Sequence, residues 1–506
     1  MLLVKPADEH NPREPSKLFF ESENVRRIIL FAYWAVIIAA TPLWWYTTSI
    51  ERLSLPTSRV RSQAGNQLKI TVPIHLHTGD SELAGGLRKE LLQITAEDAE
   101  HWNGITVHVD HGLSDPTNGS YIVKFGGEDP SIDSRTVTFP LDEKAKSAPE
   151  LKQVASTLAE LISPRSQQGD PHHRVAQFSP RYRLAFTLMD EDASAGPAVL
   201  EWDFKTAFRR HLLPTLNALS QLHNFTVESQ VQYHGRLAFN PVQVDEQSYA
   251  LTSEQLTVFV NSAEWTLSSS ASNDPVLHFL LFVPSATRRP LYIEQDGQIS
   301  NSNAFILPQW GGILIYNSET NHHINLNSTD LDPIFSTFTN QLHMLLGIPQ
   351  LPADLRSTQV RSRVITEWQL DALQRRRALE NAKGAADTLR SIVNLVEQIE
   401  NMPVGQDVKG DIQNALSALG QMYTASSLAE IFRHSARAFT LSSRAFFNPG
   451  MLAMLYFPAE HKYAVYAPLF ASAFLPLVLV AIREFKAWKA SRRPVKKVDT
   501  TKKIGS

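Results

Sequence analysis

The chain has 506 residues, of which 43% are hydrophobic and 20% are charged, and its formal net charge is -3. Proteins that bind nucleic acid through its phosphates carry a basic excess, so this composition excludes bulk nucleic-acid binding. The chain contains no cysteine, which excludes disulfides and any reaction that needs its own cysteine nucleophile. A folded domain in this chain must therefore be stabilised by its apolar core.

The N-terminal part of the chain predicts a polar tail followed by a membrane span. Residues 1–27 are polar and contain three prolines, which predicts a disordered tail. Residues 28–48 carry no charge and are long enough to cross the hydrocarbon core as a helix. Basic residues precede this stretch, and Trp44, Trp45 and Tyr46 lie near its other end. The pattern predicts a cytosolic N-terminus, with these three aromatic side chains as anchors at the membrane interface.

Residues 49–361 show alternating strand and helix patterns, which favour a large α/β domain built from a mixed sheet with helices. Strands are predicted where apolar residues alternate or run continuously, and helices where they recur every three or four positions. The predicted strands are 68–76, 105–109, 121–125, 182–189, 226–233, 276–283, 291–293 and 312–316, and the predicted helices are 83–102, 150–162 and 202–222. Asp203 is placed to act as the N-cap of the last helix, and Asp296-Gly297 predicts a turn.

Residues 362–462 change character and predict a helical section. From Ile365 to Val396 the apolar residues step by threes and fours, interrupted only where Arg375 occupies a seam position. This pattern predicts one long amphipathic helix. After a break at residues 401–410, two more helices are predicted to pack back antiparallel. We interpret the apolar stripe as the core of a helical bundle rather than a ligand groove.

A second charge-free stretch, residues 463–482, predicts another transmembrane helix, and the basic residues of 483–506 predict a cytosolic tail. The fold class is therefore a membrane protein whose two spans flank a large luminal α/β domain and a helical section. Neither span contains an acidic or basic residue that could serve as a relay or an ion ligand, which argues against transport.

Short segments spread in order along the chain carry a family resemblance. They include PLWW at 42–45, WD at 202–203, LNAL at 216–219, VLHFLLFVP at 276–284, PLYI at 290–293 and LYFP at 455–458. Together they resemble the phosphatidylinositol glycan class S family, whose members are subunits of the GPI transamidase complex.

The resemblance implies a non-catalytic, structural subunit of that complex in the endoplasmic reticulum membrane, supporting attachment of GPI anchors to the C-terminus of precursor proteins. It implies the other subunits as partners, including the cysteine-protease-like catalytic subunit, besides membrane lipid. The GPI lipid and the precursor protein are further candidate partners. It implies no cofactor and no catalytic residue in this chain.

An acidic turn provides the one alternative function. Asp190 and Asp192 directly follow a predicted strand, with the D-x-D spacing by which luminal glycosyltransferases hold a divalent metal ion and a sugar nucleotide. A luminal metal-dependent glycosyltransferase is therefore the alternative. About one such pattern is expected by chance in a chain of this length, and we interpret the segment as a solvated turn.

Other candidate sites are histidine pairs and glycosylation sequons. The histidine pairs 75/77, 172/173 and 322/323 lack cysteine and clustered carboxylates, so we interpret them as ordinary surface or loop residues. Three Asn-X-Ser/Thr sequons lie in the predicted lumen, at Asn118, Asn224 and Asn327. The resemblance is strongest around Asn224 and Asn327, which we therefore favour over Asn118.

Overall fold

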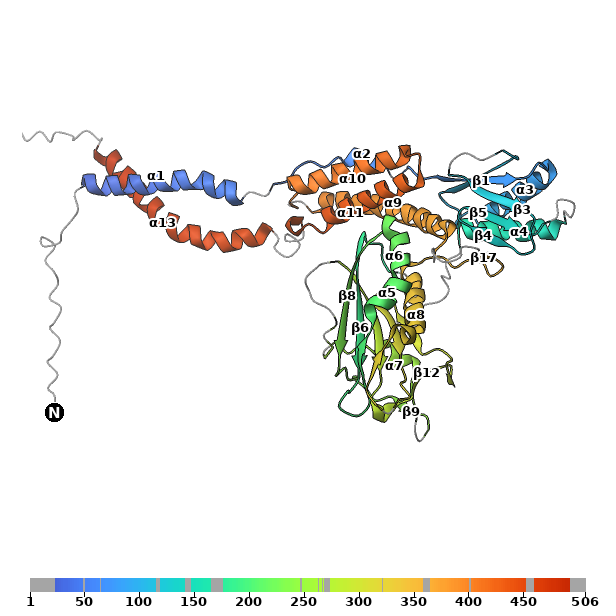
Figure 1. Cartoon of the computed structure of the whole chain (residues 1–506). Helices are drawn as coiled ribbons and strands as arrows, with labels where there is room; N and C mark the ends of the chain where they lie inside the picture. Colours follow the sequence, from blue (N-terminus) through green and yellow to red (C-terminus); the bar gives the residue numbers. More distant parts are fainter. Residues whose placement is uncertain are drawn as a thin grey trace, which may run out of the picture. The chain divides into compact units, whose positions relative to one another are not determined.

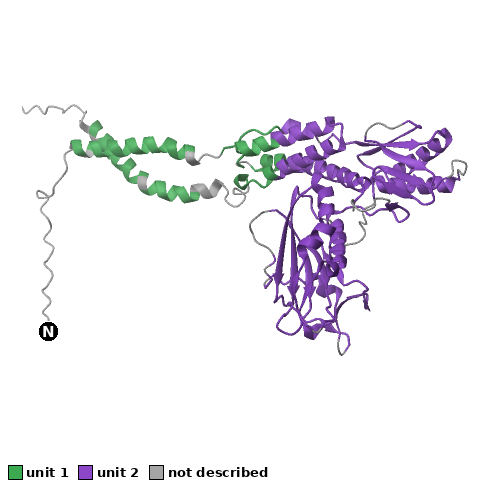
Figure 2. Ribbon diagram, viewed as in Figure 1, with its two compact units in different colours: residues 1–56, 391–412, 444–506 green, residues 57–390, 413–443 purple. Residues whose placement is uncertain are grey.

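The computed structural model describes most of the chain (Figure 1). The described residues are 23–48, 51–63, 65–114, 119–141, 147–164, 176–245, 248–262, 264–265, 267, 274–320, 322–357, 365–399, 402–451 and 459–491. The chain divides into two compact units (Figure 2): unit 1 comprises 1–56, 391–412 and 444–506, and unit 2 comprises 57–390 and 413–443. Most of the predicted tails 1–27 and 483–506 lies outside the described residues.

The first sheet of unit 2 has six strands in the order β17-β4-β5-β3-β1-β2. The strands are β1 Ile70–His77, β2 Ile105–His111, β3 Tyr121–Phe125, β4 Ser131–Asp133, β5 Thr136–Phe139 and β17 Arg356–Ser357. β1 pairs in parallel with both β2 and β3, as expected where helices connect successive strands. The predicted strands 68–76, 105–109 and 121–125 are confirmed within one or two residues.

Helices α3 (Ser81–Glu97) and α4 (Ala148–Ile162) pack on each other and on this sheet. α3 begins where the Asp80 side chain accepts hydrogen bonds from two backbone N–H groups of the first turn, and α4 begins at a capping box between Ser147 and Glu150. Such caps satisfy backbone donors that have no partner inside the helix. The two predicted helices are confirmed, although α3 ends before Trp102.

The second sheet has the order β14-β15-β11-β6-β8, in which only the edge strand β14 is antiparallel. Its strands are β6 Arg181–Asp190, β8 Asn224–Gln232, β11 Val276–Val283, β14 Ala304–Leu307 and β15 Gly311–Ile315. Both faces of β11 are covered, because Phe279 packs on Phe338 of α8 (Ser328–Leu346) while Phe282 packs on Phe259. The continuous apolar run 276–283 is therefore a central strand, as predicted.

The predicted helix 202–222 is wrong in its extent. Trp202 ends strand β7 (Val199–Trp202), and Asp203 caps a shorter helix, α5 (Phe204–His211). The chain then breaks at Leu212 and continues as α6 (Leu213–Ala218) and the 3-10 turn η2 (Leu219–Gln221). Pro214 lies at the start of α6, where its missing N–H has no cost.

Short elements complete the α/β region. They are β9 Val242–Gln243, β10 Tyr249–Leu251, α7 Ser253–Thr257, η3 Ala286–Arg288, β12 Leu291–Gln295, β13 Gln298–Ile299 and β16 Ile324–Leu326. They form one sheet of order β13-β12-β10-β9 and a pair β16-β7. The predicted turn at Asp296-Gly297 is confirmed, because it joins the antiparallel strands β12 and β13.

The helical section is confirmed in outline. Its helices are α9 Glu367–Gln398, α10 Gln406–Thr424 and α11 Leu428–Phe446, and a short helix α2 Thr57–Gln63 precedes the first sheet. Within unit 2, α9 and α11 are in contact where Gly384 lies against the ring of Phe439. The structure thus combines a mixed α/β region with several sheets and a following helical section. The predicted domain boundaries stay predictions.

Unit 1 contains the two apolar helices α1 (Glu23–Thr48) and α13 (Ala459–Ser491). Among the described residues, α1 has an apolar stretch, 27–46, long enough to cross a membrane. In α13 the apolar stretch consists of two helical segments, 464–472 and 474–486, with a bend of 40° between them. It is a second candidate span only if both segments together cross the membrane as one span. Pro468 and Pro476 lie inside this helix, and proline removes a backbone donor and bends helices.

Candidate functional site

The acidic turn, Asp190 to Asp192, lies at the carboxyl end of β6. This strand pairs with β8 on one side and with β11 on the other, and the chain visits β8 before β11. The strand order therefore reverses at β6. In open parallel sheets, ligands bind outside the carboxyl ends of the strands at such a reversal. The turn thus occupies the position where this kind of sheet would place a ligand.

Asp190 is buried rather than solvated. Only 2% of the residue is exposed, and its Oδ1 accepts a hydrogen bond from the backbone N–H of Val199 at 3.1 Å. Oδ2 has no hydrogen-bond partner among the described residues. Burial raises the pKa of this carboxyl group to about 6, against the opposing effects of the Val199 N–H and the nearby positive charge of Arg289. Asp190 therefore holds the start of β7 against the end of β6.

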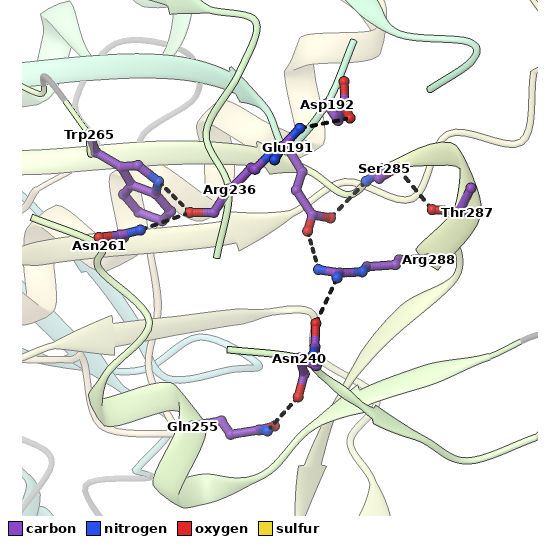
Figure 3. A network of polar contacts seen from close by, with 10 residues as sticks. All are labelled: Glu191, Asp192, Arg236, Asn240, Gln255, Asn261, Trp265, Ser285, Thr287 and Arg288. Carbon is purple, nitrogen blue, oxygen red and sulfur yellow. Dashed lines mark hydrogen bonds and ion pairs between the residues drawn. The ribbon is translucent and has the colours of Figure 1, made fainter. Parts of the chain in front are cut away.

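Buried Glu191 is the centre of a polar network that extends to the surface (Figure 3). Its carboxylate accepts a hydrogen bond from the Ser285 N–H at 2.9 Å and forms an ion pair with Arg288. The guanidinium of Arg288 also donates to Oδ1 of Asn240 at 2.8 Å, and Gln255 donates to the Asn240 carbonyl at 3.1 Å. The network joins the ends of β6 and β11 to the segment before β9. It was missed by sequence reasoning, which weighed only the flanking aspartates.

Asp192 caps its own turn. One carboxylate oxygen accepts hydrogen bonds from the N–H and the hydroxyl of Ser194, which lower the pKa of Asp192. The same carboxylate lies 3.6 Å from His234 and 3.8 Å from Arg236. Figure 3 shows Asp192 turned away from the carboxylate of Glu191. Asp192 is the only member of the turn that fits the predicted solvated loop.

The three carboxylates of the acidic turn therefore serve three different local contacts. Glu191 already faces a cation, Asp190 holds a backbone donor, and Asp192 caps a turn. Within the part of the chain that the structure describes, no three His, Asp or Glu side chains gather in a way that could hold a metal ion. The interpretation as a solvated turn is wrong for Asp190 and Glu191, because strand pairing carries both into the interior.

An open hollow of about 770 Å³ lies beside this edge, at the carboxyl end of β15. Its lining combines the aromatic rings of Tyr292 and Tyr316 with the acidic residues Glu319 and Asp330. Arg289 also lines it, but its guanidinium donates to the carbonyls of Pro284, Pro197 and Ser318. Burial, with Asp330 and Glu319 nearby, raises the pKa of Tyr316.

A second polar centre ties α9 to the first sheet. Arg375, which interrupts the predicted apolar seam, is buried and donates to the Tyr121 hydroxyl at 2.6 Å and to the Ile162 carbonyl at 3.0 Å. The Tyr121 hydroxyl in turn donates to Asp371 at 2.7 Å, and Arg135 contacts the same carboxylate at 2.9 Å. Burial raises the pKa of Tyr121, so the phenol stays neutral. Arg375 thus caps the C-terminus of α4 from within α9.

Arg377 does the same for the second sheet region. Its guanidinium donates to the carbonyls of Leu346, at the end of α8, and Ala176, at 3.1 and 3.3 Å. A guanidinium is well suited to helix carbonyls, which have no partner inside the helix and carry partial negative charge. Arg375 and Arg377, which lie in one turn of α9, therefore contact the ends of α4 and α8, two helices that pack on different sheets. This arrangement is structural rather than catalytic.

The predicted glycosylation and interface residues have different surroundings. Asn224, the first residue of edge strand β8, and Asn327, the N-cap of α8, are exposed. Asn118 lies outside the described residues. In α1, Trp45 and Tyr46 are 68% and 80% exposed, and their role as interface anchors stays a prediction. Trp44 instead packs against α13, with ring centroids 5.0 Å from Phe470 and 5.8 Å from Tyr466.

The histidine pairs do not form a shared site in the described part of the chain. His75 is buried, with its two ring nitrogens 3.1 Å from Asp110 and from the Gly112 carbonyl, so its interpretation as a surface residue is wrong. His323 accepts a hydrogen bond from the Ala198 N–H, and His322 is exposed. The pair at 172/173 lies outside the described residues.

Comparison with known proteins assigns the family. A family profile described as "Phosphatidylinositol-glycan biosynthesis class S protein" matches residues 31–491. The chain is 29% identical to the GPI-anchor transamidase component PIGS of Bos taurus over 92% of this chain and 96% of that protein. It is 29% identical to the GPI transamidase component PIG-S homolog of Schizosaccharomyces pombe over 96% of this chain and 89% of that protein. Because the profile covers most of the chain, including most of the apolar stretch of α1 and all of that of α13, the chain belongs to the PIG-S family.

Proposed function

We propose that this protein is a non-catalytic, structural component of the GPI transamidase complex, which attaches GPI anchors to proteins in the endoplasmic reticulum membrane. The observation that carries the proposal is the family match over residues 31–491, joined by similarity to transamidase components over most of the chain. The chain contains no cysteine, so it cannot supply a thiolate nucleophile of its own.

The partners follow from this role. They are the other transamidase subunits, including the cysteine-protease-like catalytic subunit, with the GPI lipid and the precursor protein as further candidates. The folded region between α1 and α13 is the proposed contact surface. A stable interface needs roughly 800 Å² from each partner, which a large folded region can provide.

The proposed topology has two spans, both termini in the cytosol, and the α/β region and the helical section in the lumen. It is supported by antiparallel contacts between α1 and α13: Arg27 lies 3.6 Å from Glu484, whereas Trp44 packs on Phe470. Protease added outside intact microsomes should remove both tails and leave one protected fragment with both spans. Protection of either tail would contradict the topology.

Purification in mild detergent tests the proposed function. A tagged chain expressed in cells should bring the other transamidase subunits with it, in constant proportion through size-exclusion chromatography. As a matched control, the α1 and α13 segments joined by a short linker should bring down fewer subunits, because the folded region is missing. Recovery of the full-length chain as a lone species would contradict membership of the complex.

A further inference from the structure

Unit 1 brings together segments that are far apart in the sequence (Figure 2). Besides α1 and α13, it contains the end of α9, the start of α10 and the residues that follow Arg444. Two connections lead from the spans to the rest of the protein, at residues 49–56 and 447–458. Both have described contacts to the same region, which comprises the end of α9, the start of α10 and the link between them.

The first connection is held by Arg52. Its guanidinium donates to the carbonyl of Val396 at 2.7 Å and to that of Ile399 at 3.4 Å. The backbone on either side pairs with Val404, through hydrogen bonds of 2.9 and 3.0 Å. The last carbonyls of a helix have no partner inside it and favour a positive charge nearby. Arg52 therefore caps the C-terminus of α9 with a residue from the stem of the first span.

Two carboxylates in the first turns of α10 hold the second connection and the end of α11 that leads into it. Asp411 is 8% exposed and forms a two-pronged ion pair with Arg444 of α11, which raises the pKa of that guanidinium. Asp407 accepts a hydrogen bond from Asn448 at 2.7 Å, which lowers the pKa of its carboxyl group. Carboxylates are stabilised at a helix N-terminus, and a paired arginine and carboxylate fix orientation as well as distance.

The spans themselves make an ordered series of contacts. From the N-terminal end of α1, Arg27 faces Glu484 at 3.6 Å, the ring of Trp34 lies 6.2 Å from that of Phe474, and the ring of Trp44 lies 5.0 Å from that of Phe470. As the contacting residues in α1 advance along the chain, their partners in α13 move back along it, so the two helices are antiparallel. Apolar helices gain little from burial against each other in lipid, and their pairing depends on packing and on how they are tethered.

We propose that Arg52, Val404, Asp407, Asp411, Arg444 and Asn448 form a junction that clamps the stems of both spans and so aligns α1 with α13 as a single anchor. The length of the first stem supports this assignment. Only residues 49–51 separate the end of α1 from Arg52, so the span ends at most about 14 Å from the junction. A short tether keeps the local concentration of the second span high, and releasing it lowers that concentration.

Cross-linking in the full-length protein tests the junction. The chain has no cysteine, so a cross-link within this chain between Trp34→Cys and Phe474→Cys reports only on contact between α1 and α13. Cross-linking is measured by gel shift in native membranes with a short bifunctional thiol reagent. Adding Arg52→Ala with Asp411→Asn should lower the cross-linked fraction about threefold or more, because one charged contact that holds each stem is removed.

Matched variants separate alignment from general damage. Asp411→Glu keeps the charge and should retain most of the cross-linking. Arg390→Ala is the control, because its guanidinium donates to Asp387, one turn away in the same helix, at 3.3 Å. If the double variant is degraded, the cross-linked fraction is measured instead in Arg52→Gln, which keeps a long side chain without the charge. The same decrease is expected. Unchanged cross-linking in the released variants, at normal protein abundance, would overturn the proposal.

Discussion

Asp190 is a carboxyl group whose charge opposes folding at neutral pH. Its pKa in the folded protein, about 6, lies above its ordinary value of 3.8, because burial disfavours the ionised form. The folded state therefore binds this proton more tightly than the unfolded state. The resulting contribution favours folding at low pH and is lost as the pH rises through about 6.

We therefore expect Asp190→Asn to stabilise the protein at pH 7.5 by on the order of 1 to 2 kcal/mol, because the amide oxygen can still accept from the Val199 N–H. The gain should disappear near pH 4, where the aspartic acid of the wild-type chain is also neutral. Thermal unfolding of the detergent-purified chain at both pH values measures it. A variant that is less stable at pH 7.5 would show that Asp190 is held in its charged form.

Buried His223 and half-buried His278 and His343 have the opposite effect on acid stability. Burial lowers the pKa of His223, His278 and His343 to about 4, from an ordinary 6.5. Their unfolded forms bind protons first on acidification, so stability should fall as the pH drops from about 6.5 to about 4. His343→Gln should flatten this decline, measured as the midpoint of urea unfolding against pH. An equally steep decline in the variant would argue against a neutral imidazole at this half-buried position.

Among the elements, Trp368 and Trp202 should differ in their contribution to stability. Trp368, in the first turn of α9, is fully buried and packs on Tyr121 at 4.3 Å between ring centroids. Trp202 ends β7 and is only half-buried, although it touches Phe204 and Phe335. We expect Trp368→Ala to cost about 3 to 5 kcal/mol and Trp202→Ala about 1 to 3 kcal/mol. Urea unfolding measures both, and a larger loss in Trp202→Ala would contradict this order.

The elements that were predicted correctly carry strong periodic signals. The apolar run of β11 could be recognised because a central strand is packed on both faces. The long apolar stripe of α9 could be recognised because it follows one helical period. Helix α8 was missed, although it has 19 residues, since Pro333 and several Ser and Thr residues lower its helix propensity. Its capping box at Asn327 and its Gly347 C-cap were the available signals.

The polar contacts could not be predicted in the same way. Glu191 and Arg288 are 97 residues apart, and Arg52 and Val396 are 344 apart. Their pairing depends on strand order and on how the helices fold back, which local periodicity does not encode. In the sequence, Arg375 could be recognised only as a charged residue that interrupts the apolar seam of α9. A buried arginine in an apolar stripe signals a partner, although the sequence does not say which.

At the scale of the whole molecule, glycosylation tests the luminal placement. Asn224 and Asn327 are exposed, and we expect both to carry N-glycans, seen as two mobility steps after endoglycosidase digestion. Thr226→Ala and Thr329→Ala should each remove one step. These changes destroy the sequons while keeping both asparagines, so the N-cap of α8 stays intact. No mobility change in the wild-type chain would count against a luminal α/β region.

The central claim is that this chain supports GPI attachment as a structural component rather than through chemistry of its own. The most direct measurement is the surface level of a GPI-anchored protein in cells that lack the endogenous chain, with the abundance of all transamidase subunits measured alongside. We expect Asp190→Asn and Asp192→Ala to restore the surface level nearly as well as the wild-type chain, whereas Trp368→Ala lowers it together with subunit abundance. Loss of anchoring in either aspartate variant, with normal abundance and an intact complex, would contradict the claim and indicate that the acidic turn takes part in chemistry.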